Sequence, residues 1–368
     1  MIKNIKKKLQ SSFKFFSYGF FKIIYGKIDN YIKVGSDNQS RFEISKIEDL
    51  NYKVYFNKNA RIYTDTVNDT AVIQKNKIIE GPSFQIRNVK FDSIEKNIVF
   101  RKGTPRLKKN IKNRLFSLLT GGAGNYNYWH WMFDVLPRFK ILSNLIDIKE
   151  IDYFLFPNLG KKYQQETLDF LKIPKLKRLS SLKYRHISCK EIITTDHPYV
   201  IENNATEEIQ NVPLWIVQWL RDIFLKEIKI DENTNLPKKI YIDRGDATSN
   251  QSQMRKIIND EEIKYKLNDI GIKSVKLGDL TFKKQIEIFN NADTIIGLHG
   301  GGFANLAFCK PGAKIIELKP STAGMMYGNL SRKCKLNYSA VAKVPEKFKQ
   351  NNQLGFIRVD FKEILNHL

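Results

Sequence analysis

The feature that most constrains the fold of this chain is a buried apolar run that ends in three adjacent glycines. Residues Thr294–Leu298 carry no charge, which is typical of a strand that is covered on both faces. The glycine turn His299–Gly302 follows directly, and a helical pattern separates it from the next apolar run, Ala313–Leu318. A strand, a glycine turn, a helix and a second strand are the repeating unit of a parallel α/β sheet. The sequence therefore predicts a doubly wound sheet in the second half of the chain.

Further signals support an α/β protein with two domains. Strands are predicted at Lys239–Ile242 and Ser274–Lys276, with a helix at Phe282–Asn290. Before residue 200, short apolar runs alternate with a helical pattern at Tyr163–Leu171. A length of 368 residues also exceeds one ordinary domain. We expect an arm over residues 1–35, α/β domains over 36–210 and 211–340, and a segment over 341–368 that packs back on the first domain.

The glycine turn is a candidate anion site. Glycines let a backbone approach a ligand closely, and the free N–H groups at a helix N-terminus suit phosphate. Arg244 follows a predicted strand, and its planar guanidinium matches two phosphate oxygens. The candidates for binding a phosphate-bearing ligand are Arg244, Arg255, His299, Gly300, Gly301, Gly302, Asn305 and Glu317, the last through ribose hydroxyls. The alternative is a tight structural turn with a buried histidine and a local Arg–Asp pair.

A second candidate site lies on a predicted helix. His130 and Asp134 are four residues apart and therefore share one helix face. A carboxylate, or a histidine supported by one, can take the proton of an attacking hydroxyl. The aromatic rings of Trp129 and Trp131 could stack on sugar rings. The alternative is a buried His–Asp pair that only ties the helix down, and the sequence leaves both open.

The N-terminal arm is basic and amphipathic. Its apolar residues recur every three or four positions, at Ile2, Ile5, Leu9, Phe13, Phe16, Phe20, Ile24 and Ile28. Lysines interrupt every apolar run well before the ~18 residues that a membrane-spanning helix needs. This pattern predicts a helix on an anionic membrane surface. The alternative is a helix that packs its aromatic face on the protein body.

Charge and cysteine content bound the remaining possibilities. The net charge is +24, which attracts polyanions, but no basic run accompanies a recognisable nucleic-acid motif. We therefore expect no nucleic-acid partner. The three cysteines are widely spaced, which argues against a zinc site and favours a reducing compartment such as the cytoplasm.

Three segments together resemble the glycosyltransferase 61 family, also known as the DUF563 or capsular-polysaccharide biosynthesis family. These segments are Tyr128–Arg138, Tyr241–Arg244, and Ile296–Asn305 followed by Pro311-Gly312 and Glu317. Gly301 stands where alanine is common in the family signature. The match spans about residues 125–320 and leaves the arm and the region before residue 100 uncovered.

The resemblance implies a GT-B fold, in which two Rossmann-like domains face a cleft. It implies an inverting transfer from a nucleotide sugar to a glycan or lipid-linked glycan acceptor, without a metal or other cofactor. The second half of the chain would bind the donor, and Asp134 or His130 would be the base. Trp129, Trp131 and Arg138 would lie on the acceptor side.

The sequence also suggests a cellular role for such an enzyme and leaves one alternative function open. The arm suits an enzyme of surface polysaccharide synthesis that is peripheral on the inner face of the plasma membrane. The alternative is a non-catalytic module that retains the fold and binds a nucleotide or a polysaccharide.

Overall fold

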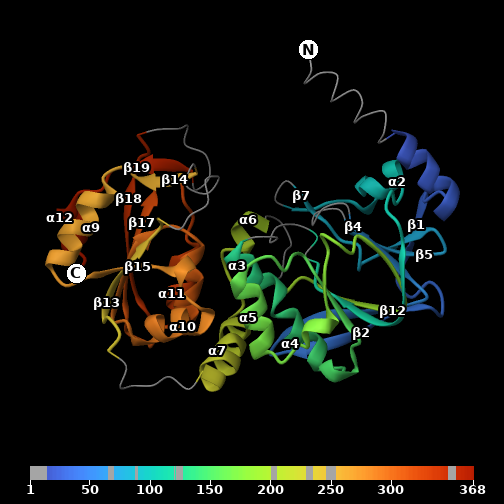
Figure 1. The fold of residues 1–368 in the computed structure, drawn as a ribbon, viewed down its shortest axis with the longest axis horizontal. Helices are drawn as coiled ribbons and strands as arrows, with labels where there is room; N and C mark the ends of the chain where they lie inside the picture. Colours follow the sequence, from blue (N-terminus) through green and yellow to red (C-terminus); the bar gives the residue numbers. More distant parts are fainter. Residues whose placement is uncertain are drawn as a thin grey trace, which may run out of the picture. The chain divides into compact units, whose positions relative to one another are not determined.

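The structure is a computed structural model, and it divides the chain into two compact units (Figure 1). The first unit is Met1–Gly160 with Ile173–Ala205, and the second is Lys161–Lys172 with Thr206–Leu368. The residues that the structure describes are 15–64, 70–87, 90–119, 121, 127–199, 205–228, 235–245, 254–346 and 354–368. Residues 1–14 of the predicted arm lie outside them.

The second unit contains the predicted parallel sheet. Its five strands run in the order β15-β13-β16-β17-β18, and every neighbouring pair is parallel. The strands are β13 (Lys239–Asp243), β15 (Lys273–Lys276), β16 (Thr294–Leu298), β17 (Lys314–Pro320) and β18 (Asn337–Lys343). All of β16 is buried, as its uncharged sequence predicted. The Rossmann-like α/β expectation is thereby confirmed for this unit.

Helices connect these strands as parallel connections require. They are α9 (Asp260–Asp269), α10 (Phe282–Asn291), the 3₁₀ helix η6 (Gly301–Phe308) and α11 (Met326–Lys333), and α7 (Leu214–Ile228) precedes the first strand, β13. The side chain of Thr281 accepts a hydrogen bond from the Lys284 amide and so caps α10. The helix α10 matches the predicted helix at Phe282–Asn290 within one residue.

The C-terminal segment packs on the second unit, so the expectation that residues 341–368 return to the first domain is wrong. Strand β19 (Gly355–Ile357) pairs with β14 (Arg255–Ile257). Helix α12 (Phe361–Leu365) follows, and its Ile364 joins the buried cluster that contains Tyr241 and Ile296. Burial of apolar side chains against the parallel sheet of the second unit thus determines the position of the C-terminal segment.

The second unit also includes a helix from the middle of the first half of the sequence. Helix α5 (Lys162–Phe170) is the predicted helix at Tyr163–Leu171. Its Phe170 packs against Phe224 and Phe282, with ring centroids 6.1 and 6.0 Å away. Glu166 accepts a 2.7 Å hydrogen bond from the Phe282 amide. The predicted boundary near residue 210 therefore needs correction, because α5 belongs to the second unit.

The first unit departs from the Rossmann-like expectation because its sheet is mixed. In its described part the strand order is β1-β6-β5-β4-β12-β9-β10-β11, with β3 on β12 and β2 on β3. Strands β9, β10, β11 and β12 pair in parallel, whereas β3, β4 and β5 pair antiparallel. The strands are β1 (Asn30–Lys33), β2 (Ser40–Ile47), β3 (Leu50–Lys58), β4 (Arg61–Thr64), β5 (Thr70–Gln74), β6 (Lys77–Glu80), β9 (Lys109–Ser117), β10 (Tyr153–Phe156), β11 (Arg178–Ser180) and β12 (His186–Thr195).

Several short helical segments accompany this sheet. Residues 15–25 form an N-terminal helix, which is blue in Figure 1. The others that matter below are α2 (Ile98–Lys102), α3 (Tyr128–His130), the π-helical turn Trp131–Val135 and α4 (Arg138–Ser143). Strand β1 pairs with β6 at the edge of the sheet, so the arm ends before Asn30 rather than at residue 35. In the described ranges, no helix combines the length and the apolar character needed to cross a membrane.

Candidate active site

The second unit places the candidate phosphate-binding residues where its strand order reverses. Counted along the chain, the five strands of the sheet lie in the order 2-1-3-4-5, so the reversal falls between β13 and β16. In open α/β sheets, ligands bind outside the carboxyl ends of the strands at this point. Arg244 directly follows β13, and His299 directly follows β16. The two segments that the sequence predicted are therefore neighbours.

The His299 ring is hydrogen-bonded to a buried carboxylate, that of Glu317. His299 Nδ1 hydrogen-bonds one Glu317 oxygen, and the Tyr338 hydroxyl donates to the other. Glu317 is fully buried and His299 is 2% exposed. The Tyr327 ring meets the imidazole edge-on, with centroids 4.8 Å apart. Glu317 lies in the interior with both oxygens engaged, which does not fit the expectation that it accepts from ribose hydroxyls.

Two glycines of the turn lie close to neighbouring side chains. Arg244 Nη1 donates a 2.9 Å hydrogen bond to the His299 carbonyl oxygen. A Cβ atom at Gly300 would lie 2.7 Å from that same nitrogen, and one at Gly302 would lie 2.8 Å from Leu277 Cδ1. Gly301 begins η6 and is half-buried. The glycines thus let the guanidinium lie against the backbone that opens the helix.

A second arginine adds to the positive charge here. Burial, with the nearby charge of Arg244, lowers the pKa of Arg255 to about 10, so the guanidinium stays charged at neutral pH. Tyr327 and Glu317 oppose this shift, which places them within electrostatic range of Arg255. Two neighbouring guanidinium groups repel each other, and an anion with two negative groups relieves that repulsion. The arrangement suits a diphosphate.

The first unit brings His130 and Asp134 together. The Asn127 side chain accepts from the Trp129 amide and so starts helix α3, and the chain then widens into the π-helical turn. His130 Nδ1 lies 2.6 Å from Asp134 Oδ2. The Asp134 side chain is 3% exposed and that of His130 is 15% exposed. The imidazole is therefore the more accessible member of the pair.

Each of the two groups shifts the pKa of the other, upward for His130 and downward for Asp134. Burial alone would lower the pKa of His130, but the charge and hydrogen bond of Asp134 outweigh it and raise that pKa. Burial would raise the pKa of Asp134, but the His130 charge and hydrogen bond, helped by His197, hold it well below its usual range. Asp134 thus stays a carboxylate, and His130 is the member that can exchange a proton near neutral pH.

Comparison with known proteins identifies the family. A model of the family described as Glycosyltransferase 61 matches residues 128–316, just over half of the chain. The chain belongs to this family. The match begins within one residue of the helix that carries His130 and extends into β17, so it takes in Asp134, Arg244 and His299.

Curated relatives of this glycosyltransferase 61 member share a shorter segment. The chain is 31% identical over 102 residues to the EGF domain-specific O-linked N-acetylglucosamine transferase of Gallus gallus, which is 26% of this chain and 19% of the relative. The proteins of the same name from Xenopus laevis and Mus musculus are each 30% identical over 105 residues, which is 27% of this chain and 20% of each relative. The chain thus covers about a fifth of the length of these relatives.

Sequence reasoning missed two buried residues beside Asp134, both just past the carboxyl end of β12. His197 Nε2 lies 3.8 Å from Asp134 Oδ2, and burial lowers the pKa of His197, which keeps this imidazole neutral. Burial and the nearby Asp134 charge raise the pKa of Tyr199 well above its usual value. A histidine directly after a buried strand was the available signal, but only the fold shows that β12 ends beside the His130 helix.

Polar atoms in this cluster still have hydrogen-bonding capacity. Among the described residues, Arg138 Nη2 is buried without a hydrogen-bond partner, and the Tyr199 hydroxyl lies near the Asp134 carboxylate. Arg138 otherwise donates to the backbone oxygens of Asp134 and Thr195, at 2.9 and 3.2 Å. Buried polar atoms without partners are uncommon in native proteins and mark places where a polar ligand or water is bound. The cluster is therefore suited to hydroxyl groups.

Three of the candidate residues, Trp129, Trp131 and Asn305, are buried among other side chains. Trp131 is fully buried against Phe156, and Trp129 is 2% exposed against Phe133, so the expectation that these rings stack on sugars is wrong. Asn305 is fully buried, and its amide donates to Gln285 on α10, so it does not reach a ligand. Arg138 is 1% exposed and donates from Nε to the Asp134 backbone oxygen, and its acceptor-side role stays a prediction.

The described residues contain no group of three or more histidine, cysteine, aspartate or glutamate side chains that could hold a metal ion. Metal independence nevertheless stays a prediction.

Proposed function

We propose that the chain is an inverting, metal-independent glycosyltransferase that moves a sugar from a nucleotide sugar to a glycan acceptor. The observation that carries the proposal is the placement of Arg244 and the His299 turn at the carboxyl ends of adjacent strands β13 and β16. Membership of the glycosyltransferase 61 family supports it. The parallel sheet of the second unit supports a GT-B arrangement, in which this unit binds the donor.

On the donor side, Arg244 and Arg255 would hold the diphosphate. Their guanidinium groups, with the N–H groups at the start of η6, would stabilise the negative charge that develops as the diphosphate departs. His299, oriented by Glu317, would contact a phosphate or sugar hydroxyl. This donor-side charge stabilisation is the work that a divalent metal performs in other transferases.

On the acceptor side, we assign the base to His130 rather than Asp134. A carboxylate whose pKa is held well below its usual range is a poor proton acceptor near pH 7, whereas a histidine whose pKa is raised is well matched. Asp134 binds Nδ1 and so leaves Nε2 to the acceptor. Asp134 is then a positioning residue, which fixes the ring and stabilises the imidazolium.

The proposed step balances as a single displacement. The acceptor hydroxyl oxygen attacks the anomeric carbon, and its proton passes to His130 Nε2. The bond between that carbon and the diphosphate oxygen breaks, and the diphosphate leaves with the electron pair. Attack from the face opposite the leaving group inverts the anomeric configuration.

The acceptor class that we propose is a glycan or lipid-linked glycan in surface polysaccharide synthesis, such as capsular polysaccharide or lipopolysaccharide. The protein would act in the cytoplasm, peripheral on the inner face of the plasma membrane. The exposed apolar face of the helix over residues 15–25 supports membrane contact. The relatives' name includes N-acetylglucosamine, so nucleotide-activated N-acetylglucosamine is the first donor to test.

The experiment is transfer and donor hydrolysis by the purified full chain with a panel of nucleotide sugars. Arg244→Ala should weaken donor binding by about tenfold to a hundredfold, since charge-assisted hydrogen bonds to charged groups contribute about 1.5–3 kcal/mol. Arg332→Ala, an exposed arginine on α11, is the matched control and should bind donor like the wild type. Donor binding by Arg244→Ala equal to that of the control would remove the donor-site assignment.

A further inference from the structure

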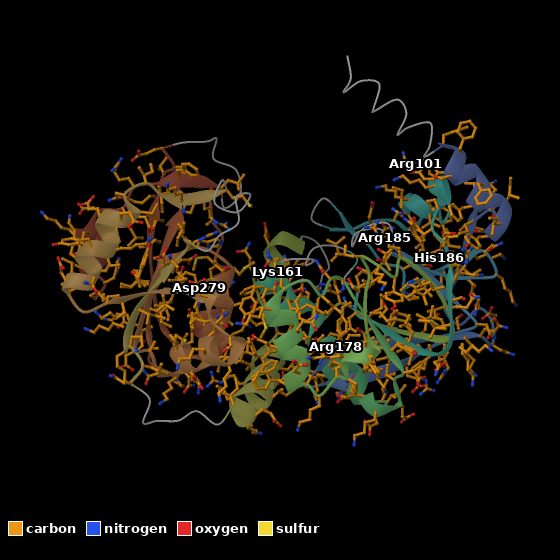
Figure 2. All side chains as sticks on the ribbon, in the orientation of Figure 1. Arg101, Lys161, Arg178, Arg185, His186 and Asp279 are labelled. Carbon is orange, nitrogen blue, oxygen red and sulfur yellow. The ribbon has the colours of Figure 1, made fainter. Side chains whose placement is uncertain are left out.

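The helix over residues 15–25 is fastened to the first unit by one face. Lys22 Nζ donates a 3.0 Å hydrogen bond to the Arg101 carbonyl oxygen, and Arg101 lies beside this helix in Figure 2. The Tyr25 hydroxyl accepts from the Lys108 amide at 3.0 Å, and the Tyr25 ring meets His186 with centroids 4.9 Å apart. The helix therefore has a fixed inner side.

The outer side of this helix is apolar and exposed. Phe16, Phe20, Ile23 and Ile24 follow helical spacing on one face. Phe16 is 73% exposed and Ile23 is 86% exposed. The alternative that this aromatic face packs on the protein body is therefore wrong for these residues. A contiguous exposed apolar face marks a surface that meets a partner or a membrane.

A cationic hollow adjoins the helix. It encloses about 350 Å³, and its lining includes Arg61, Lys75, Asn76 and Lys108. Arg61 Nη2 donates to Asn76 Oδ1 at 2.9 Å, and the Lys108 ammonium lies 5.3 Å from the centroid of the Tyr25 ring. The residue that anchors the helix thus contacts the wall of the hollow. Three of the lining residues are cationic and none is acidic.

Among the described residues, the hydrogen-bond partners of the Arg61 guanidinium are all neutral. Arg61 is 8% exposed, and it bonds Thr104, His186, Asn76 and the Tyr25 carbonyl oxygen. Burial lowers the pKa of Arg61 to about 10, and burial with the charges of Arg61 and Lys108 lowers the pKa of His186 to about 4. The guanidinium is therefore charged at neutral pH beside a neutral imidazole. Buried charges are ordinarily paired, so this one favours an external anion.

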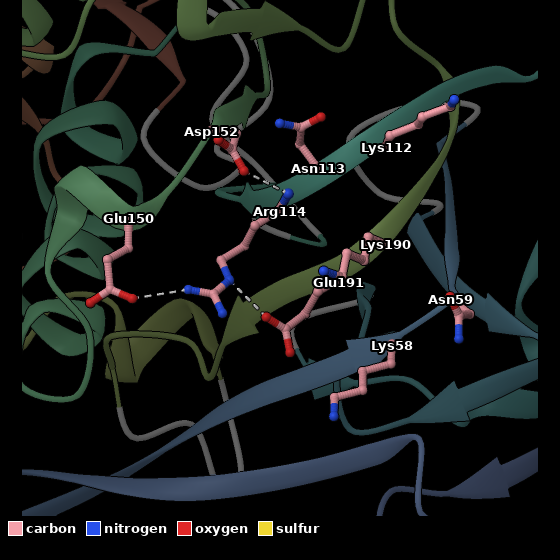
Figure 3. Close-up of a pocket in the computed structure, with 9 residues that line it drawn as sticks. All are labelled: Lys58, Asn59, Lys112, Asn113, Arg114, Glu150, Asp152, Lys190 and Glu191. Atoms are coloured by element: carbon pink, nitrogen blue, oxygen red, sulfur yellow. Dashed lines mark hydrogen bonds and ion pairs between the residues drawn. The ribbon is translucent and has the colours of Figure 1, made fainter.

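The neighbouring groove of the same unit has a different charge balance (Figure 3). It encloses about 530 Å³ and contains four cationic and three acidic residues. Its Arg114 bonds Glu191 at 2.8 Å and Glu150 at 3.2 Å, so its charge is compensated inside the protein. That groove is a suitable internal comparison, because three acidic residues offset its four cations and its arginine is already paired.

We propose that the hollow around Arg61 binds the phosphate group of an anionic membrane lipid while the outer face of the helix inserts among the acyl chains. The proposal rests on the membrane association included in the proposed function. An amphipathic helix binds a membrane by buried apolar area together with attraction to anionic headgroups, and both are present side by side. A nucleic acid would satisfy the charge but would leave the aromatic face exposed.

The test is co-sedimentation of the full chain with vesicles of phosphatidylcholine alone or mixed with phosphatidylglycerol. The double variant Lys75→Gln with Lys108→Gln removes two charges from the hollow and leaves the buried Arg61 in place. Its control, Lys112→Gln with Lys190→Gln, removes two charges from the groove of Figure 3. We expect the first pair to weaken binding to anionic vesicles about 25-fold, since each of the two cations near the surface contributes about fivefold. The control pair should weaken it much less.

A third variant tests the helix. Phe20→Ser with Ile23→Ser should reduce binding to both vesicle types, because these side chains are exposed and their removal costs the fold little. Equal losses from the two lysine pairs, or tight binding to a single-stranded oligonucleotide that only the hollow pair abolishes, would overturn the proposal. So would stabilisation by inorganic phosphate without any vesicle binding. Transfer to a soluble acceptor should persist in all these variants, which separates this proposal from the proposed enzymatic activity.

Discussion

The substitution Asp134→Asn tests how the first unit prepares its base. Asparagine has nearly the same shape, so it removes the charge and leaves the packing. The lost contact is a 2.6 Å charge-assisted hydrogen bond to His130 in a site where the carboxylate is 3% exposed. Such bonds contribute about 1.5–3 kcal/mol, and each 1.36 kcal/mol corresponds to one pKa unit. We therefore expect the pKa of His130 to fall by about 1–2 units.

The assay is the pH dependence of kcat/KM for transfer. The wild type should lose activity as pH falls through the raised pKa of His130, because a protonated imidazole accepts no proton. In Asp134→Asn this limb should move to lower pH by about 1–2 units, and the plateau should fall at least about tenfold. Asp147→Asn is the control, since Asp147 is exposed and an asparagine caps its short helix equally well.

The same pair makes stability depend on pH. The pKa of Asp134 is lowered on folding, so this group stabilises the fold above its unfolded value of about 4. The pKa of His130 is raised, so this group stabilises the fold below about 6.5. The difference in unfolding free energy between the wild type and Asp134→Asn should thus be largest between about pH 4 and 6.5. The reasoning would be refuted if Asp134→Asn left both the acidic limb of the pH profile of kcat/KM and its plateau unchanged.

Three other substitutions have defined outcomes. Gly300→Ala should raise the donor Kd at least about tenfold with little change in Tm, because the added Cβ would lie 2.7 Å from Arg244 Nη1. Calorimetric titration measures the Kd, and an unchanged value would contradict the close approach of Gly300 and Arg244. Glu317→Gln should lower the free energy of unfolding by about 1–3 kcal/mol, since it disturbs a fully buried hydrogen bond to His299. Denaturant unfolding measures this, and an unchanged free energy of unfolding would contradict it. Trp131→Ala should cost about 3–5 kcal/mol as a core cavity; loss of activity with full stability would instead indicate a sugar-stacking ring.

The sequence was most informative where short-range pattern decides structure. The uncharged run Thr294–Leu298 became a strand buried on both faces, and its glycine turn lies beside Arg244 because parallel strands align their carboxyl ends. The spacing of His130 and Asp134 placed them on one helix face, and they are bonded. These features depend only on local geometry and on the handedness and order of a parallel sheet.

Features that depend on distant contacts were not predictable. Leu136 donates its amide to the Trp131 carbonyl oxygen, five residues back, and this π-helical turn changes which side chains face the core. The α-helical spacing therefore misplaced the tryptophans. The pairing of β14 with β19 joins segments about a hundred residues apart, and no periodicity indicates it. His197 reached Asp134 by the same kind of long-range contact.

The most direct test of the account measures donor binding and turnover in the same pair of variants. His130→Gln should bind the nucleotide sugar with a wild-type Kd and lose turnover by about 10²–10⁴-fold, the usual contribution of a positioned acid–base group. Arg244→Ala should weaken donor binding instead. Full turnover in His130→Gln, or unchanged donor affinity in Arg244→Ala, would contradict the assignment of proton transfer to the first unit and diphosphate binding to the second.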